Sequence, residues 1–120
     1  MAEQAKQKAT QLLVWGVLSH MVTDWLLQND WMAVNKKDIR HPAAWVHSGI
    51  YAIGMSFVFK WPAALLLGLF HLIIDSGKPL QWWFGRFKRL EDGPMTIPVA
   101  LWTDQALHAS LIAVMALLSE

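Results

Sequence analysis

Three of the four apolar segments of this chain carry an aspartate and a histidine four residues apart. The pairs are His20 and Asp24, His71 and Asp75, and Asp104 and His108. Residues i and i+4 lie on the same face of an α-helix, so each pair directs both side chains to one side. Ionisable groups in apolar helices are costly, and they commonly face an interior and mark function. The pattern therefore predicts apolar helices that pack around a shared polar centre.

The composition favours a membrane protein over a soluble one. Of the 120 residues, 55% are hydrophobic and 16% are charged, and the mean hydropathy is +0.31. Soluble domains carry about 25% charged residues. The eight tryptophans support the same conclusion, because tryptophan is enriched at membrane–water interfaces. A chain of this length forms one domain, so we predict a single membrane domain over residues 1–120, surrounded by lipid.

Net charge and cysteine content exclude other classes of protein and site. The net charge is +1, which gives no general attraction to nucleic acid, so no nucleic-acid partner is expected. Cysteine is absent, which excludes disulfides and thiolate metal sites. Any metal bound by this chain must therefore be held by histidine and carboxylate side chains. The sequence leaves the oligomeric state open and is compatible with a homo-oligomer.

Four apolar segments are each near the length that crosses a bilayer. They cover about residues 10–28, 43–59, 62–76 and 97–118. A helix needs about 20 residues to span the hydrocarbon core, so the third segment requires tilt or local thinning. We predict an all-α fold, a polytopic membrane four-helix bundle with four spans. A soluble bundle is the alternative, but the last three segments offer almost none of the polar outer face that soluble helices need.

The two long connections between these segments are basic. Residues 29–41 and 77–96 hold seven of the ten lysines and arginines. An excess of these residues marks the cytoplasmic side of a membrane. Both long connections are therefore predicted to lie in the cytoplasm, with the protein in the inner (cytoplasmic) membrane as a multi-pass protein. Aromatic and basic residues alternate between Leu80 and Leu90, which predicts a short helix in the membrane interface within this third connection.

The reversed order of the last pair predicts how the polar groups are layered. The first and third segments run toward the cytoplasm with His before Asp, whereas the fourth runs away from it with Asp104 before His108. All three aspartates then lie nearer the cytoplasmic surface, with the paired histidines one turn deeper. The second segment adds His47 near the level of the aspartates and Tyr51 one turn below. The pattern predicts one cluster in the cytoplasmic half of the bilayer.

Seven side chains make up the candidate metal site. They are His20, Asp24, His47, His71, Asp75, Asp104 and His108. Imidazole and carboxylate groups suit Zn, Fe, Mn or Co, and four-helix bundles can build two-metal sites from such ligands. We predict one or two divalent transition-metal ions, with Zn or Fe favoured. Asp24, Asp75 and Asp104 are the candidate catalytic residues, as metal ligands or as general base.

A metal-dependent hydrolase is the favoured functional hypothesis. A two-metal site generates a hydroxide and clamps a phosphoryl or acyl oxygen, so the expected substrate is lipid-linked or phosphorylated and reached from the cytoplasmic leaflet. Two alternatives stay open. The same groups could carry metal ions or protons without catalysis. They could also be polar clasps that fix helix register in a structural membrane subunit.

The motif order also resembles a known family. The residues that carry the likeness are His20, Thr23, Asp24, Trp25, Gln28, Asp30, Trp31, Met32, Ala33, Lys36, His47, His71, Ile74, Asp75, Asp104, Gln105 and His108. In this order they resemble a family of small bacterial and phage membrane proteins catalogued as domain of unknown function 3307. The resemblance covers nearly the whole chain. It implies a multi-helix membrane protein and no established reaction.

Overall fold

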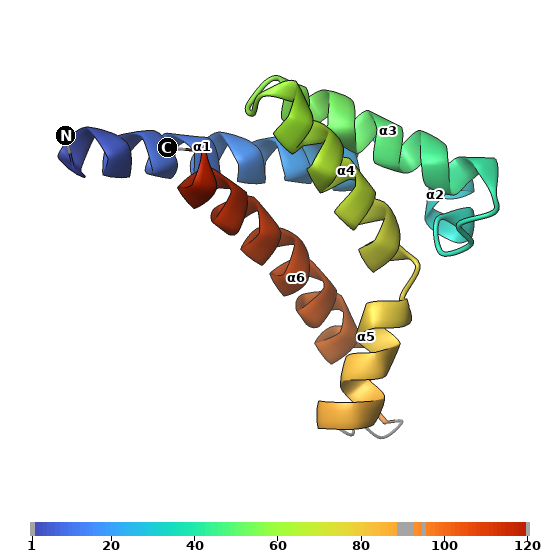
Figure 1. The fold of residues 1–120 in the computed structure, drawn as a ribbon. Coiled ribbons are helices and arrows are strands. Elements are labelled where there is room, and N and C mark those ends of the chain that lie inside the picture. Colours follow the sequence, from blue (N-terminus) through green and yellow to red (C-terminus); the bar gives the residue numbers. More distant parts are fainter. Residues whose placement is uncertain (1, 89–92, 95, 120) are drawn as a thin grey trace.

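The computed structural model describes residues 2–88, 93–94 and 96–119, and this part of the chain is helical without any strand. Its α-helices are α1 (Ala2–Met21), α2 (Asp30–Asn35), α3 (Pro42–Ser56), α4 (Trp61–Asp75), α5 (Lys78–Trp83) and α6 (Thr96–Leu118) (Figure 1). Two π-helical segments, η1 (Val22–Leu26) and η2 (Phe84–Lys88), continue α1 and α5. The predicted all-α class is confirmed.

Capping residues explain where the helices begin and end. The side chain of Asn29 accepts a hydrogen bond from the backbone N–H of Met32 and caps α2. Helix α3 has Pro42 at its start, and Nδ1 of His41 accepts a hydrogen bond from the N–H of Ala43. After α4, Gly77 has φ of +79°, a left-handed conformation that glycine adopts at little cost. The chain can therefore turn sharply from α4 into α5.

The four longest helices form a closed ring. Helix α1 packs against α3 and α6, and α4 packs against the same two helices. In Figure 1, α3 returns antiparallel to α1, and α6 returns antiparallel to α4 at an angle to the first pair. The first half of α1 projects beyond the ring, and α2 and α5 lie at the opposite end of it from the α3–α4 turn. The described parts of the two long connections therefore lie at one end of the ring.

A compact apolar cluster fills one side of the ring. Its buried members are Tyr51, Met55, Phe59, Ala64, Leu67, Ile112 and Ala116. Close helix contacts depend on small residues here: a Cβ atom built on Gly68 would lie 2.8 Å from Cβ of Ala52, and one on Gly16 would lie 2.6 Å from Cγ2 of Ile112. Glycine allows the backbones of neighbouring helices to approach in this way.

One helix of the described residues is long and apolar enough on its own to cross a membrane. This helix is α6, with 23 residues, and the sharply bent pair Trp61–Asp75 and Lys78–Arg86 would be a second if it formed one span. Helices α3 and α4 have 15 residues each, or about 22 Å at ~1.5 Å per residue, against a core of ~30 Å. The described residues form six α-helices, so the all-α class is confirmed, whereas the membrane four-helix bundle with its four crossings stays a prediction.

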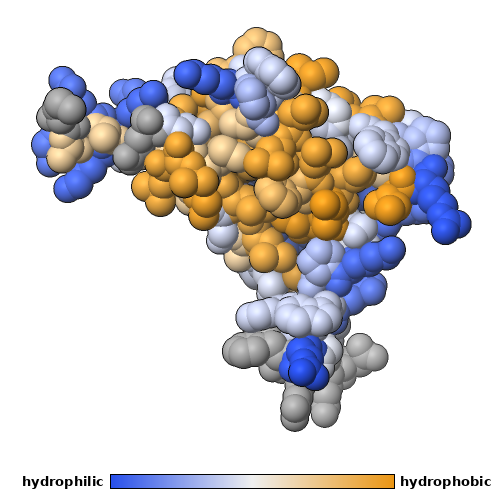
Figure 2. Space-filling model, in the orientation of Figure 1, coloured by the Kyte–Doolittle hydropathy of each residue, from blue (hydrophilic) through white to orange (hydrophobic). Residues whose placement is uncertain are grey.

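The outer surface of the ring is rich in large apolar side chains. Those exposed include Ile53, Phe57, Leu65, Leu69, Ile73, Leu101, Trp102 and Leu117. Figure 2 shows apolar residues gathered across the middle of one face, with hydrophilic residues at its margins. Apolar surfaces of this extent mark contacts with a partner or a membrane. The predicted short helix of the third connection is present as α5 and η2, and residues 89–92 and 95 of that connection lie outside the described residues.

Candidate metal centre

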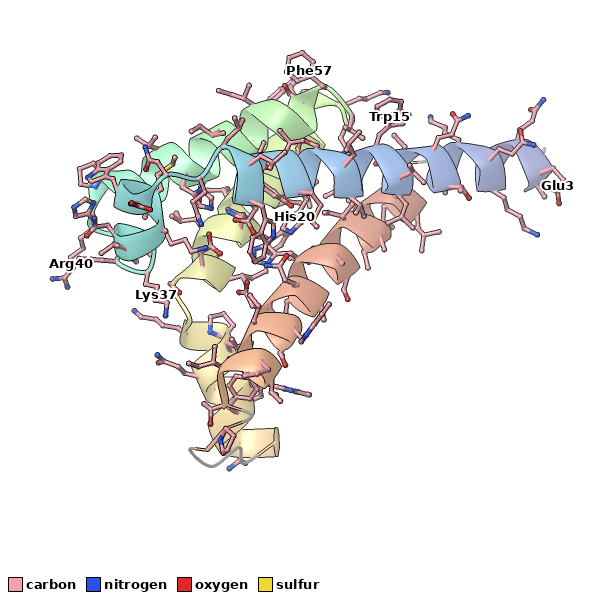
Figure 3. All side chains as sticks on the ribbon, turned by 180° about the vertical axis from the view of Figure 1, so that it is seen from behind. Glu3, Trp15, His20, Lys37, Arg40 and Phe57 are labelled. Atoms are coloured by element: carbon pink, nitrogen blue, oxygen red, sulfur yellow. The ribbon has the colours of Figure 1, made fainter. Side chains whose placement is uncertain are left out.

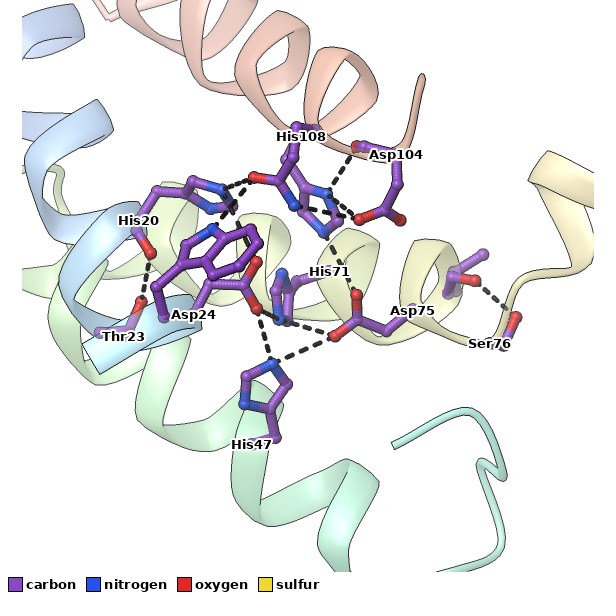
Figure 4. Close-up of polar contacts among 12 residues, drawn as sticks. His20, Thr23, Asp24, His47, His71, Asp75, Ser76, Asp104 and His108 are labelled. Atoms are coloured by element: carbon purple, nitrogen blue, oxygen red, sulfur yellow. Dashed lines mark hydrogen bonds and ion pairs between the residues drawn. The ribbon is translucent and has the colours of Figure 1, made fainter. Parts of the chain in front are cut away.

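The seven predicted site residues come from all four helices of the ring and lie around one centre (Figure 4). Helix α1 supplies His20 and η1 supplies Asp24, while α3 supplies His47. The last two turns of α4 and the middle of α6 supply the remaining four, His71, Asp75, Asp104 and His108. Six of the seven are at most 5% exposed, and Asp104 is half-buried. The i, i+4 spacing therefore directs the pairs inward, as the sequence predicts.

A first group of four side chains offers ligand atoms that all lie within 4.8 Å of one another. They are Asp24, His47, His71 and Asp75. Nε2 of His47 donates a hydrogen bond to Oδ1 of Asp24 at 2.9 Å and lies 3.2 Å from Oδ2 of Asp75. Nε2 of His71 lies 3.0 Å from that same Oδ2 and 3.7 Å from Oδ1 of Asp24. Two imidazoles and two carboxylates are a chemically sufficient set for one transition-metal ion.

A second group shares Asp75 with the first. Its members are Asp75, Asp104 and His108. Oδ1 of Asp75 lies 3.5 Å from Nε2 of His108, whereas Oδ2 faces His47 and His71. Nδ1 of His108 donates a hydrogen bond to the backbone carbonyl of Asp104 at 2.8 Å. This bond fixes the ring orientation, and a metal-ligating histidine is usually held in the same way by its other nitrogen.

A π-helical turn places Asp24 in the centre. Helix α1 changes to π-helix at Val22, and Thr23 and Asp24 are buried within this turn. Oγ1 of Thr23 donates a hydrogen bond to the backbone carbonyl of Ser19 at 2.8 Å. Short π-helical turns inside α-helices occur frequently at functional sites. Oδ2 of Asp24 in this turn lies 3.7 Å from Nε2 of His20, the last but one residue of α1.

Several ligand atoms at the centre are buried but form no hydrogen bond with a described residue. They are Nε2 of His71, Nε2 of His108 and both carboxylate oxygens of Asp75. Burying polar groups in this way costs free energy unless a partner satisfies them. These atoms also face one another at 3.0 to 3.5 Å without hydrogen-bonding geometry. This set of imidazole and carboxylate groups therefore fits a site for a cation better than a set of His–Asp pairs that only hydrogen-bond to each other.

His20 lies at the edge of the centre and belongs to neither ligand group. Its Nε2 donates a hydrogen bond to Oε1 of Gln105 at 2.8 Å, and its ring lies 5.2 Å from that of His108. Nε2 of Gln105 in turn donates to Oδ2 of Asp104 at 3.1 Å. Six of the seven predicted ligands thus fall in the two groups, and His20 lies beside them, linked to Asp104 through the amide of Gln105; its role as a ligand stays a prediction. Gln105 was not among the predicted site residues, although it directly follows Asp104.

The centre is closed on its inner side by aromatic and apolar residues. The ring of Tyr51 stacks on that of His71, with centroids 4.0 Å apart and planes 8° apart. Tyr51 is also the first member of the buried apolar cluster. The ring of His71 is thereby held in one plane, and the apolar cluster separates the polar centre from the far end of the ring.

Comparison with known proteins identifies a family. No curated protein and no solved structure matches the chain. A family model described as "Protein of unknown function (DUF3307)" matches residues 12–120, a range that contains both ligand groups and His20. The match extends over most of the chain and confirms the resemblance seen in its motifs. The chain therefore belongs to this family of proteins of unknown function, DUF3307.

Proposed function

We propose that this protein is a membrane-embedded, metal-dependent hydrolase that cleaves a phosphate bond of a lipid-linked or phosphorylated substrate. The observation that carries the proposal is the pair of buried ligand groups that share Asp75. Two-metal sites commonly share a carboxylate, with the two ions about 3.5–4 Å apart. The two oxygens of Asp75 face different groups, which suits such a bridging role.

The negative charges of two buried carboxylates support the presence of a bound metal ion. Asp24 and Asp75 carry side chains that are only 3% and 2% exposed, and no lysine or arginine forms an ion pair with them among the described residues. Buried carboxylates without a cation are strongly unfavourable. A mixed imidazole and carboxylate set suits Zn or Fe, which we propose as the resident metals. When bound, such ions supply an activated hydroxide and stabilise charge on phosphoryl oxygens.

The three carboxylates are proposed to have different roles. The side chain of Asp104 is 21% exposed, compared with 3% for Asp24 and 2% for Asp75. Asp104 can therefore accept a proton from water at the edge of the site, which is the role of a general base. Asp24 and Asp75 are enclosed by imidazoles and suit the role of metal ligands. Gln105 positions Asp104 through its amide.

A metal or proton carrier is the second candidate. The four imidazole rings follow one another, with centroids 4.8 Å apart for His47 and His71, 4.7 Å for His71 and His108, and 5.2 Å for His108 and His20. Such a row suits proton movement. Apart from Tyr51, the buried cluster next to these rings consists of apolar side chains that cannot pass on a proton. The structure thus favours a site open at one end over a path through the protein.

We propose further that the protein lies in the inner membrane with α2 and α5 on the cytoplasmic side. The exposed apolar surface and the position of both basic connections at one end support this orientation. The native chain has no cysteine, so single cysteines can be labelled cleanly. In intact cells an impermeant thiol reagent should label Lys60→Cys, in the α3–α4 turn, and not Lys37→Cys. Labelling of Lys37→Cys from outside would reverse the orientation.

Phosphate release by the purified protein tests the hydrolase proposal. The wild-type protein in detergent, loaded with Zn or Fe, should release phosphate from lipid phosphates, and a chelator should abolish the release. Asp104→Asn should retain the ion of the group formed by Asp24, His47, His71 and Asp75 and lose turnover by roughly 10²–10⁴-fold, the usual contribution of a general base. Asp30→Asn, an exposed residue of α2, is the matched control and should turn over normally. Metal-loaded wild-type protein that releases no phosphate from any lipid phosphate would favour the carrier.

A further inference from the structure

A cleft connects the surface of the protein to the ligand groups. It has a volume of about 420 Å³ and lies between the segment that follows α2, the end of α4, α5 with η2, and α6. Asp75 and Asp104 line it together with Lys36 and Lys37, which follow α2. Ligand pockets for small molecules commonly have volumes of about 300–1,000 Å³. The cleft is therefore large enough for a ligand that reaches the carboxylates from outside.

Among the residues that the structure describes, the two lysines of the cleft have no anionic partner. Neither ammonium group forms a hydrogen bond or ion pair with a residue that the structure describes. Lys36 is half-buried and lines the cleft together with Asp75 and Asp104. Lys37 is exposed and lies on the side of α2 that faces α5 (Figure 3). Two cations that no described residue neutralises, beside the two ligand groups, provide a site for an anionic group.

The remaining walls of the cleft are largely apolar. Leu80 and Phe84 line it from α5 and η2, and Ile97 and Leu101 line it from α6. A small soluble anion would gain nothing from these side chains. An anion attached to a hydrocarbon chain would bury apolar surface against them while its charged end meets the lysines. The combination of paired cations and apolar walls therefore indicates an amphipathic anion.

We propose that this cleft binds an anionic lipid through its phosphate group, with Lys36 and Lys37 contacting the phosphate oxygens and the α5 and α6 side chains contacting the acyl chains. Lysine is a common phosphate ligand as a point charge. The bound phosphate lies beside Asp75 and Asp104, so the inference rests on the proposed function and names the substrate class for it. Lys36 and Lys37 are binding residues for the substrate, and α5 is a wall of the substrate site.

Binding of a non-hydrolysable lipid tests the cleft without turnover. The probe is the phosphonate analogue of dihexanoyl phosphatidic acid, titrated into metal-loaded protein in detergent and followed by calorimetry. The double variant Lys36→Gln/Lys37→Gln should bind it roughly tenfold or more weakly, because charge-assisted contacts are lost. The control Lys60→Gln/Lys78→Gln removes the same charge outside the cleft lining and should bind as the wild type does. The single variant Lys37→Gln, on an exposed side chain, should show part of the loss with an unchanged unfolding midpoint.

The other outcomes separate the sources of the phosphate and the two proposals. Inorganic phosphate that binds as tightly as the lipid phosphonate would show that the apolar walls take no part and would overturn the lipid assignment. Equal binding by the wild type and the cleft double variant would overturn the role of the lysines. Lysine-dependent binding without phosphate release from the hydrolysable lipid would sustain the cleft and contradict the hydrolase. Phosphate release that does not depend on the lysines would support the hydrolase and contradict the binding of substrate in the cleft.

Discussion

Replacing Asp75 with asparagine should deprive the protein of bound metal. Asp75 is the one residue common to both ligand groups, with Oδ2 beside His47 and His71 and Oδ1 beside His108. The amide removes the negative charge and one of the two oxygens. Loss of a residue that only supports a ligand weakens metal affinity by about 10–100-fold, so loss of the shared ligand should exceed that range. Elemental analysis of the purified variant beside the wild type measures the effect.

The Asp75→Asn variant also distinguishes a metal centre from a helix clasp. In the clasp interpretation, asparagine loses ionic contacts and destabilises the fold, while the metal content of the preparation does not change. In the metal interpretation, the variant no longer buries an uncompensated charge, so the apo form of the variant should be at least as stable as the apo wild type. Asp30→Asn, outside the centre, should match the wild type in both measurements. Undiminished metal in Asp75→Asn would exclude Asp75 from the ligands.

Chelation of the metal should lower the unfolding temperature of the wild-type protein by roughly 10 °C. Asp24 and Asp75 would then repel each other inside the ring, with His47 and His71 as their nearest polar partners. A ligand present at 100 times its Kd stabilises the native state by about 2.7 kcal/mol, and each kcal/mol shifts Tm by about 4 °C in a domain of this size. Adding Zn should restore the midpoint. Asp75→Asn should show little response to the chelator, and a wild type without any response would contradict the prediction.

The sequence predicted most of the helix boundaries because proline and glycine mark them. The segments expected at 43–59, 62–76 and 97–118 correspond to α3, α4 and α6, which start beside Pro42, Pro62 and Pro98. Helix α1 begins eight residues before the apolar segment predicted at about residues 10–28. Apolar character marks only the part of α1 from about residue 10 onward. The first turns of α1 consist of alanine, glutamate, glutamine and lysine, which favour a helix although most of them are polar.

The sequence also predicted which side chains lie together in the site, but it could not predict that they form two ligand groups that share Asp75. The i, i+4 spacing fixes a shared face within each helix. The division into two groups around Asp75 depends on how the helices cross and on the π-helical turn at Asp24, which spacing alone does not show. His20 is bound by Gln105 for the same reason, since the approach of α1 to α6 brings these two side chains together.

The sequence did not predict the cleft that leads to the ligand groups. Lys36 and Lys37 are far from Asp104 in the chain, and the sequence suggested only that they lie on the basic side of a membrane. Their approach to the centre depends on α2, a short helix capped by Asn29, folding back against α3. Contacts of this kind arise from tertiary packing and leave no periodic pattern.

The metal content of the purified wild-type protein tests the shared His/Asp centre most directly. The protein would be purified in detergent from cells grown with ample Zn and Fe. The number of metal ions per protein molecule would be obtained from elemental analysis and from amino-acid analysis of the same sample. With both ligand groups filled, we expect one transition-metal ion for each group, and a loss of both signals in Asp75→Asn measured in parallel. Folded wild-type protein that contains no transition metal, and takes up none when Zn or Fe is added, would contradict the metal centre and leave the pairs as clasps between helices.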